Sequence, residues 1–228
     1  DICHPAHVHY FKNVIWNLEK KGYDIKIVAR DKDVTLKLLN AYNFEYEVIG
    51  GFKNGFLRKA TKIISNDLAL FKIAIEFDPD LFISFSSPYA AQVSKLMRKH
   101  HIAFSDTEEM GPLLWLMAPF SDAICTPKCF RKKLKTKKHF TLDGYFELAY
   151  LHPKYFKPEK DIFEYLDKSK NEKLIILRLI SWNAYHDVSL KGINTGTELK
   201  IIKKLENYGK VYISSERTLN EKLKKYEL

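Results

Sequence analysis

The sequence predicts an α/β fold built on parallel sheets, and two patterns along the chain support this prediction. Apolar residues recur at helical spacing in some segments and form short continuous runs in others, and the two kinds of segment alternate. Strands that are joined by helices require right-handed crossovers and parallel pairing. With 228 residues, of which 46% are hydrophobic, the chain is long enough for one or two domains with a substantial core.

The first part of the chain is predicted to alternate helices and strands. Val8, Phe11, Ile15 and Leu18 give the first helix an apolar stripe, and Gly22 is a natural end for it. Helices are expected over residues 7–21, 34–41 and 57–77, and strands over residues 25–29, 44–49 and 81–85.

The same alternation continues to the end of the sequence. Pro153 and Pro158, among Lys and Glu residues, indicate a hinge over residues 151–172. We therefore expect one domain over residues 1–160 and the start of a second over residues 161–228, which is too small to bury a core alone. The chain begins at Asp1 and stops within a charged helical pattern, so a fragment is expected. Further strands are predicted over 102–104, 123–125, 174–179 and 211–214, and helices after Ser86-Ser87-Pro88 and over 108–117 and 198–207.

Composition limits the class of protein. The net charge of +10 favours anionic partners, namely nucleic acid, nucleotide phosphates or an anionic membrane surface. No stretch approaches the roughly 18 to 20 apolar residues that span a bilayer, and no signal peptide is recognisable. Three cysteines, an odd number, exclude a disulfide framework and suggest a reducing compartment. We expect a cytoplasmic protein that contacts the membrane peripherally, with Cys125 and Cys129 as free thiols.

The first candidate site is the segment 1–9, which leads directly into a helix. A helix N-terminus with a nearby histidine can hold an anion or supply a general base, which points to His4 and His7. Three histidines within six positions also suggest a metal site, but His7 and His9 fall at the start of the helix and no further carboxylate is adjacent. Capping and packing roles are the structural alternative, and we predict no metal.

Two further candidate sites follow predicted strands. Ser86 and Ser87 lie at a strand-to-helix junction, where backbone N–H groups can receive a substrate oxygen or a phosphate, although a simple helix cap explains them equally. Asp106 and Glu108 follow the strand 102–104. Carboxylates there can bind sugar hydroxyls or act as a base, or can simply complement a helix dipole.

The fourth candidate site follows the strand 174–179, and it is the densest in polar groups. In open parallel sheets ligands bind beyond the carboxyl ends of the strands, so a polar set there favours a binding role over packing. The residues concerned are Arg178, Ser181, Trp182, Asn183, His186 and Asp187.

Two basic stretches are also present. Residues 128–138 hold seven Lys or Arg, and residues 52–62 interleave Phe with Lys and Arg. Aromatic residues set among cations can dock on an anionic membrane, whereas a solvated lysine-rich surface is the alternative. No recognised nucleic-acid motif accompanies them, so specific nucleic-acid binding is not expected.

Four segments together resemble the family known as domain of unknown function 354: residues 1–11, 29–33, 104–108 and 181–187. Its members are similar to GT-B glycosyltransferases and to UDP-N-acetylglucosamine 2-epimerases. The resemblance therefore implies two Rossmann-like, doubly wound parallel-sheet domains, the second incomplete in this chain. A more distant likeness is to the N-acetylglucosaminyltransferase that makes lipid II, in which the position of His7 nominates it as the acceptor-activating base. Glycines in that enzyme's loops allow the backbone to come close to the substrate, and these glycines are missing here.

Three functions remain open at this point. In a glycosyltransferase, His7 is the base, Glu108 or Asp106 orients the acceptor, and His4, Ser86 and Ser87 contact the substrate. The polar set after strand 174–179 then binds a nucleotide-sugar donor, the acceptor is a lipid-linked sugar or a glycan, and no other cofactor is needed. A UDP-sugar 2-epimerase on the same fold is the second possibility, and a non-catalytic basic module for membrane or nucleic acid is the third.

Overall fold

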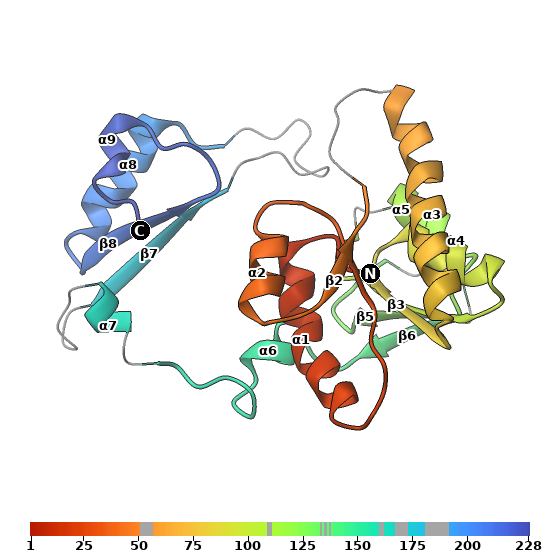
Figure 1. Cartoon of the computed structure of the whole chain (residues 1–228). Coiled ribbons are helices and arrows are strands. Elements are labelled where there is room, and N and C mark those ends of the chain that lie inside the picture. Colours follow the sequence, from red (N-terminus) through yellow and green to blue (C-terminus); the bar gives the residue numbers. More distant parts are fainter. Residues whose placement is uncertain are drawn as a thin grey trace. The chain divides into compact units, whose positions relative to one another are not determined.

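The computed structural model describes residues 1–50, 57–108, 111–132, 134, 136, 138–159, 162–166, 173–180 and 192–228. They form two compact units, Asp1–Lys157 and Pro158–Leu228, and the division falls inside the segment expected to be a hinge. Both units combine helices with parallel strands, which confirms the predicted fold class (Figure 1).

The first unit contains six helices and six strands among its described residues. The helices are α1 (Pro5–Glu19), α2 (Thr35–Ala41), α3 (Leu57–Phe77), α4 (Pro88–Leu96), α5 (Gly111–Met117) and α6 (Leu148–Leu151). The strands are β1 (Ile27–Ala29), β2 (Tyr46–Val48), β3 (Leu81–Phe85), β4 (His100–Phe104), β5 (Ala123–Pro127) and β6 (His139–Leu142).

The N-terminal residues join two groups of strands in the first unit. Ile2 forms a parallel bridge with Ala29 of β1, and the backbone nitrogen of Asp1 donates to the carbonyl of Ile83 in β3 (2.8 Å). Since β1 pairs with β2 and β3–β4–β5–β6 pair in that order, the segment 1–3 lies between β1 and β3. The chain therefore runs outward in both directions from this central segment, as in a doubly wound Rossmann-like sheet.

Helices cover both faces of this sheet because side chains alternate along each strand. Ile27 and Ala29 point into a core shared with α1 and α2, whereas Val28 points into a second core shared with α3 and α4. A third core joins α4 and α5 to β4 and β5. The 21-residue α3 packs along α4 (Figure 1).

Most predicted elements are confirmed, with shifted ends. The helix of residues 57–77 and the strands 81–85 and 174–179 have the predicted limits. Three elements differ from the prediction, and two of the differences have local causes. The first helix begins at Pro5, because His4 caps it, and the helix expected over 108–117 spans Gly111–Met117. Strand β6 was not expected, since its residues are largely exposed and therefore lack a buried strand's apolar run.

The second unit is a two-stranded parallel sheet with α8 and α9 packed on one face. It contains α7 (Ile162–Tyr165), β7 (Leu174–Leu179), α8 (Thr195–Leu205), β8 (Lys210–Ser215) and α9 (Glu221–Lys224). Its core joins α8 and α9 to the inward-facing residues of both strands, such as Ile202 and Ile213. Ile176 lies on the other face and is exposed.

The membrane-spanning potential of the helices and the state of the cysteines were both addressed by the composition. No helix among the described residues has the length and apolar character needed to cross a membrane. All three cysteines are described, and Cys3, Cys125 and Cys129 are free thiols, as predicted for the last two.

A fully buried histidine links three elements of the first unit. His101 in β4 accepts a hydrogen bond at Nε2 from the Ser84 hydroxyl of β3 (2.9 Å) and donates from Nδ1 to the Ser121 hydroxyl (2.9 Å). This assignment follows because Ser121 donates its own proton to the carbonyl of Met117 (3.1 Å). Burial lowers the pKa of His101 to about 4, so the ring is neutral and this network is complete at pH 7.

We expect acid to destabilise the protein through His101. The unfolded ring has a pKa near 6.5 and the folded ring about 4, so the unfolded state binds more protons as the pH falls through this window. The free energy of unfolding should therefore drop by about 3 kcal/mol between pH 7 and pH 4 from this residue. Denaturant titrations should show a flatter pH dependence for His101→Gln, which cannot titrate, and an unchanged one for His100→Gln. Equal slopes in both variants would exclude this role.

Candidate functional site

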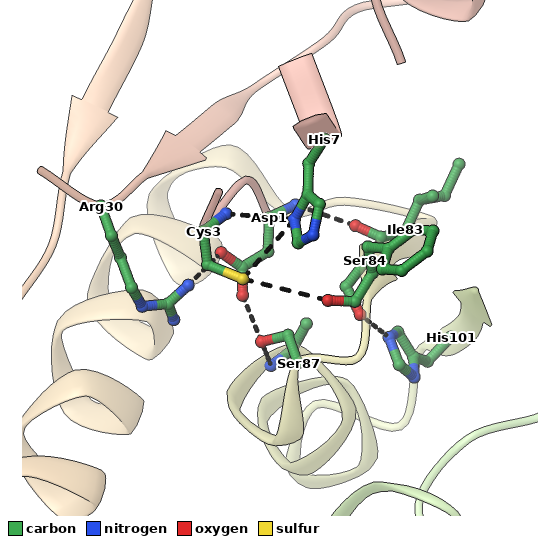
Figure 2. Close-up of polar contacts among 10 residues, drawn as sticks. Asp1, Cys3, His7, Arg30, Ile83, Ser84, Ser87 and His101 are labelled. Carbon is green, nitrogen blue, oxygen red and sulfur yellow. Dashed lines mark hydrogen bonds and ion pairs between the residues drawn. The ribbon is translucent and has the colours of Figure 1, made fainter. Parts of the chain in front are cut away.

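The candidate site lies at the carboxyl ends of the central strands in the first unit. The chain turns to opposite sides of the sheet after the segment 1–3, which leads into α1, and after β3, which leads into α4. Rossmann-like proteins bind ligands in a crevice at such a switch point. We define the crevice of this chain as the surface on which the segments 3–7, 85–87 and 105–106 meet. His4, His7, Ser86 and Ser87, all predicted site residues, lie on these two connections. Figure 2 shows His7 and Ser87.

A buried carboxylate ties the connections together. Asp1 accepts a hydrogen bond from the Arg30 guanidinium at the end of β1 (2.6 Å), and its second oxygen accepts from the Ser87 hydroxyl (Figure 2). Ser87 also caps α4 by accepting from the backbone N–H of Ala90 (3.4 Å). One side chain therefore fixes the ends of three neighbouring strands relative to one another.

Arg30 was not among the predicted site residues. It is only 9% exposed, and its guanidinium lies 4.5 Å from the centroid of the Tyr89 ring in the first turn of α4. Its Nε and Nη2 atoms, and Oδ1 of Asp67, are buried without a hydrogen-bond partner among the described residues. Burial raises the pKa of Asp67, and the nearby Arg30 charge opposes this shift. Ordered water or a polar ligand group can satisfy these atoms.

His7 lies in the crevice as a buried, uncharged imidazole. It is 8% exposed, and its ring packs 4.7 Å from that of Phe85. Burial, followed by nearby cationic groups of which His4 is the strongest, holds the pKa of His7 well below its ordinary value. Its Nδ1 faces the backbone N–H of Cys3 (3.4 Å) and the Cys3 thiol (3.5 Å), whereas Nε2 has no partner among the described residues (Figure 2). A neutral imidazole at this place can accept a proton or donate a hydrogen bond.

The other two N-terminal histidines have separate local roles. His4 is the N-cap of α1, because its Nδ1 accepts from the backbone N–H of Ala6 (3.2 Å). His9 contacts the Tyr42 hydroxyl through Nδ1 (3.3 Å) and packs on the ring of Tyr150. No three His, Cys, Asp or Glu side chains converge on a common metal position anywhere in the described part of the chain.

The serine hydroxyls after β3 are occupied by protein contacts. Ser86 has a positive φ of 51°, and its hydroxyl donates to the Ser105 hydroxyl at the end of β4 (3.0 Å). Its backbone N–H donates to the carbonyl of Phe104 (2.9 Å). Ser86 and Ser87 therefore shape the crevice floor, with Ser87 in the helix-capping role that the sequence left open.

The two predicted carboxylates are not brought together. Asp106 lies at the crevice rim, and partial desolvation raises the pKa of its carboxyl, opposed by hydrogen bonds of which that from Thr107 is the strongest (2.9 Å). Glu108 instead accepts from the backbone N–H of Arg131 (2.6 Å), and its carbonyl lies 3.4 Å from Lys132 Nζ. Glu108 thus anchors the basic segment 131–132, and no described contact joins it to His7.

An aromatic wall continues from His7 towards α6. Tyr10, Phe85 and Phe146 pack with ring centroids 5.1–5.9 Å apart, and Tyr10 stacks 6.4 Å from His7. The Tyr10 hydroxyl donates to Glu147, which precedes α6 (3.4 Å). The sequence analysis did not identify Tyr10 or Glu147 as site residues. Glu147 lies 137 residues after Tyr10, and no local pattern distinguishes it from the other exposed glutamates.

The predicted donor-binding residues belong mainly to an undescribed part of the second unit. Arg178 is described: it forms an ion pair with Glu216, and its Nη1 lies 3.4 Å from the Ser214 hydroxyl. Residues Ser181, Trp182, Asn183, His186 and Asp187 lie outside the described residues. Nearby, the buried Glu198 in the first turn of α8 pairs with Arg217.

An apolar cavity of the first unit lies away from this crevice. Its volume is about 160 Å³, and it is lined by apolar side chains of α1 and α3 and by the amino ends of β1 and β3, for example Phe11, Leu70 and Phe82. Apart from Asp1, none of the candidate catalytic residues reaches it. We therefore place the candidate chemistry at the polar crevice.

The chain is similar to known proteins in both sequence and structure. The model of the protein family of unknown function DUF354 matches residues 1–227. An uncharacterised protein of Methanocaldococcus jannaschii is 24% identical over 185 residues, which cover 78% of this chain and 54% of that protein. The chain thus spans about half the length of this relative.

Similar solved structures are proteins of GT-B fold, among them UDP-GlcNAc 2-epimerases and MurG. The UDP-GlcNAc 2-epimerase of Methanocaldococcus jannaschii has a TM-score of 0.65 at 13% identity, covering 99% of this chain and 66% of that one. The epimerase of Neisseria meningitidis, solved with UDP-GlcNAc, has a TM-score of 0.62 at 15% identity, covering 98% and 66%. MurG of Acinetobacter baumannii has a TM-score of 0.54 at 12% identity, covering 99% and 69%. These likenesses confirm the expected GT-B-type fold, and at such identities they establish the fold alone.

We expect the buried Arg30–Asp1 pair to be essential for stability. Arg30→Met leaves the Asp1 carboxylate buried without its cation, which should lower the free energy of unfolding by about 3–5 kcal/mol. Lys26→Met, which breaks the exposed pair with Glu47, is the matched control and should cost less than about 1 kcal/mol. Urea denaturation of both variants measures the difference. A loss for Arg30→Met as small as that of the control would show that Asp1 is not anchored in this way.

Proposed function

The chain belongs to the DUF354 family of unknown function, and from the chemistry of its crevice we propose that it is a GT-B glycosyltransferase that uses a nucleotide-sugar donor. One observation carries the proposal: an uncharged imidazole, His7, lies at the switch point of a doubly wound sheet, and its Nε2 has no partner among the residues that the structure describes. A second support is the fold, which is shared with MurG and with an epimerase solved with UDP-GlcNAc.

In this proposal the first unit binds the acceptor. His7 receives the proton of an acceptor hydroxyl as that oxygen attacks the anomeric carbon of the donor, and Asp106 orients the hydroxyl. A base role requires the tautomer with Nδ1–H directed at the Cys3 sulfur, which leaves the Nε2 lone pair free. General base catalysis of this kind contributes roughly 10²–10⁴-fold to the rate.

The second unit is proposed to bind the donor. Arg178 lies near the carboxyl end of β7, and Ser181, Asn183 and His186 follow this strand in the sequence, at the place where ligands approach a parallel sheet. Cationic and N–H donors there would neutralise charge that develops on the leaving nucleoside diphosphate. The bond that breaks joins the anomeric carbon to the diphosphate oxygen, and no further cofactor is required.

A thermal-shift series with nucleoside diphosphates and their sugars tests donor binding. A ligand that binds only the folded protein stabilises it by about 2.7 kcal/mol at one hundred times its Kd, so one nucleotide should raise the melting temperature clearly. We expect Ser181→Ala and His186→Ala to remove the shift. The absence of a shift with every nucleotide would reject the donor assignment.

His7 can be tested by substitutions that separate its two possible roles. His7→Ala should lower kcat by about 10²–10⁴-fold if the ring is the base. His7→Gln retains a hydrogen-bond donor but cannot take a proton, so it should be equally impaired. Full transfer by His7→Gln would show a donor role, and full transfer by His7→Ala would remove His7 from the mechanism.

The epimerase reading remains a second candidate, favoured by the higher TM-scores of the epimerases. An epimerase converts a UDP-sugar with no acceptor present. Incubation with UDP-GlcNAc alone, followed by product analysis, therefore distinguishes the two: an epimerised sugar nucleotide supports the epimerase, and an unchanged one supports the transferase.

We also propose that the first unit meets an anionic membrane through α5, where a lipid-linked acceptor would be located. Trp115 is 80% exposed on α5, and Leu116 beside it is also exposed. The inner face of α5 packs on Phe130, so the exposed cations Arg131 and Lys132 lie on the adjoining segment. An aromatic side chain beside cations suits the interface of an anionic bilayer.

Vesicle co-sedimentation tests this membrane contact. Binding to phosphatidylglycerol vesicles should exceed binding to phosphatidylcholine vesicles, and Trp115→Ala should weaken it about tenfold, since a buried aromatic side chain contributes roughly 1.5–3 kcal/mol. Tyr208→Ala, which removes an exposed aromatic residue of the second unit, is the control. Equal salt-sensitive binding to a DNA duplex would indicate a generic polyanion module instead.

A further inference from the structure

The surface beside His7 carries two carboxylates from distant parts of the chain. Asp106 follows β4, and Glu147 precedes α6. The Glu147 segment is held against α1 because the Asn13 amide donates to the carbonyl of Ala149 (2.7 Å) and Tyr10 packs on Phe146 (5.9 Å). Tertiary contacts, rather than sequence proximity, therefore place Glu147 next to the crevice.

Tyr10 connects this acidic pair to His7. Its hydroxyl donates to Glu147 Oε1 (3.4 Å), and its ring stacks on His7 (6.4 Å). Burial, and then the negative charges of Asp106 and Glu147, raise the pKa of Tyr10, so the phenol keeps its proton and remains a donor. Asp106 directly follows Ser105, whose hydroxyl accepts from Ser86 (3.0 Å), and Glu147 contributes to the raised pKa of Asp106.

These groups favour one class of ligand. Two neighbouring carboxylates accept hydrogen bonds from hydroxyl groups and repel a phosphate or a carboxylate. The nine-tenths buried His7 imidazole, whose Nε2 has no partner among the described residues, faces the same crevice and supplies one more polar contact. A protein with a net charge of +10 thus has an acidic rim at its candidate site.

We propose that Tyr10 and Glu147, together with Asp106, form the acceptor subsite and select an uncharged, hydroxyl-bearing sugar over a phosphorylated or acidic one. This inference rests on the proposed transferase function. Glu147 is a specificity-determining residue: its carboxylate accepts from a sugar hydroxyl and excludes anionic acceptors. Tyr10 is a positioning residue that holds Glu147 at the rim.

Ligand-observed NMR without any nucleotide tests the subsite separately from donor binding. The probes are glucose and N-acetylglucosamine, each compared with its 6-phosphate. The wild-type protein should bind the neutral sugars about tenfold more tightly than the phosphates. Glu147→Gln should weaken the binding of the neutral sugars about tenfold, because a hydrogen bond to a charged group is lost. It should also reduce the preference for the neutral sugars over their 6-phosphates. Tyr10→Phe should have a smaller effect in the same direction.

Glu76→Gln, which alters an exposed carboxylate of α3, is the matched control and should behave like the wild type. Preference for the phosphates, or failure of both neutral sugars to bind, would overturn the subsite. Unchanged binding and selectivity in Glu147→Gln would overturn the role of Glu147. If the sugars bind but no nucleotide raises the melting temperature, the proposed donor binding would be overturned and the acceptor subsite would stand.

Discussion

The candidate site depends on one buried carboxylate. Asp1 receives the Arg30 guanidinium from the end of β1 and the Ser87 hydroxyl from the start of α4, while its backbone nitrogen bonds to β3. A buried charge is costly unless it is paired and hydrogen-bonded, and Asp1 has both kinds of partner. The same contacts set the spacing of the central strands, so the crevice forms only when the sheet does.

Burial then decides the chemistry of the histidines. His7 and His101 both lose water on folding, and both keep a pKa below the ordinary value, so neither carries charge at pH 7. The two histidines differ in the hydrogen-bond partners of their ring nitrogens. Serine partners occupy both nitrogens of His101, which makes it structural. Nε2 of His7 has no hydrogen-bond partner among the described residues, and the proposed base role uses this nitrogen.

Charged side chains are unevenly distributed over the first unit. Arg131 and Lys132 lie beside the exposed apolar residues of α5, whereas the crevice rim has Asp106 and Glu147. A polyanionic surface and a neutral sugar can therefore be recognised by different parts of the same unit. Glu108, anchored to the segment 131–132, belongs to the basic part rather than to the crevice.

The sequence alone determined the α/β class and most of the helices and strands. It also placed His4 and His7 at the start of a helix and Ser86 and Ser87 at a strand-to-helix junction, because apolar periodicity and turn chemistry are local signals. It did not give β6, which is exposed, or the central role of the segment 1–3, which is visible only through its pairing with β1 and β3. Only the tertiary structure decided which side chains meet: it joined Arg30 to Asp1, separated Glu108 from His7, and brought Glu147 to Tyr10. Those contacts span tens of residues or more along the chain, and they depend on packing between elements, which no local pattern encodes.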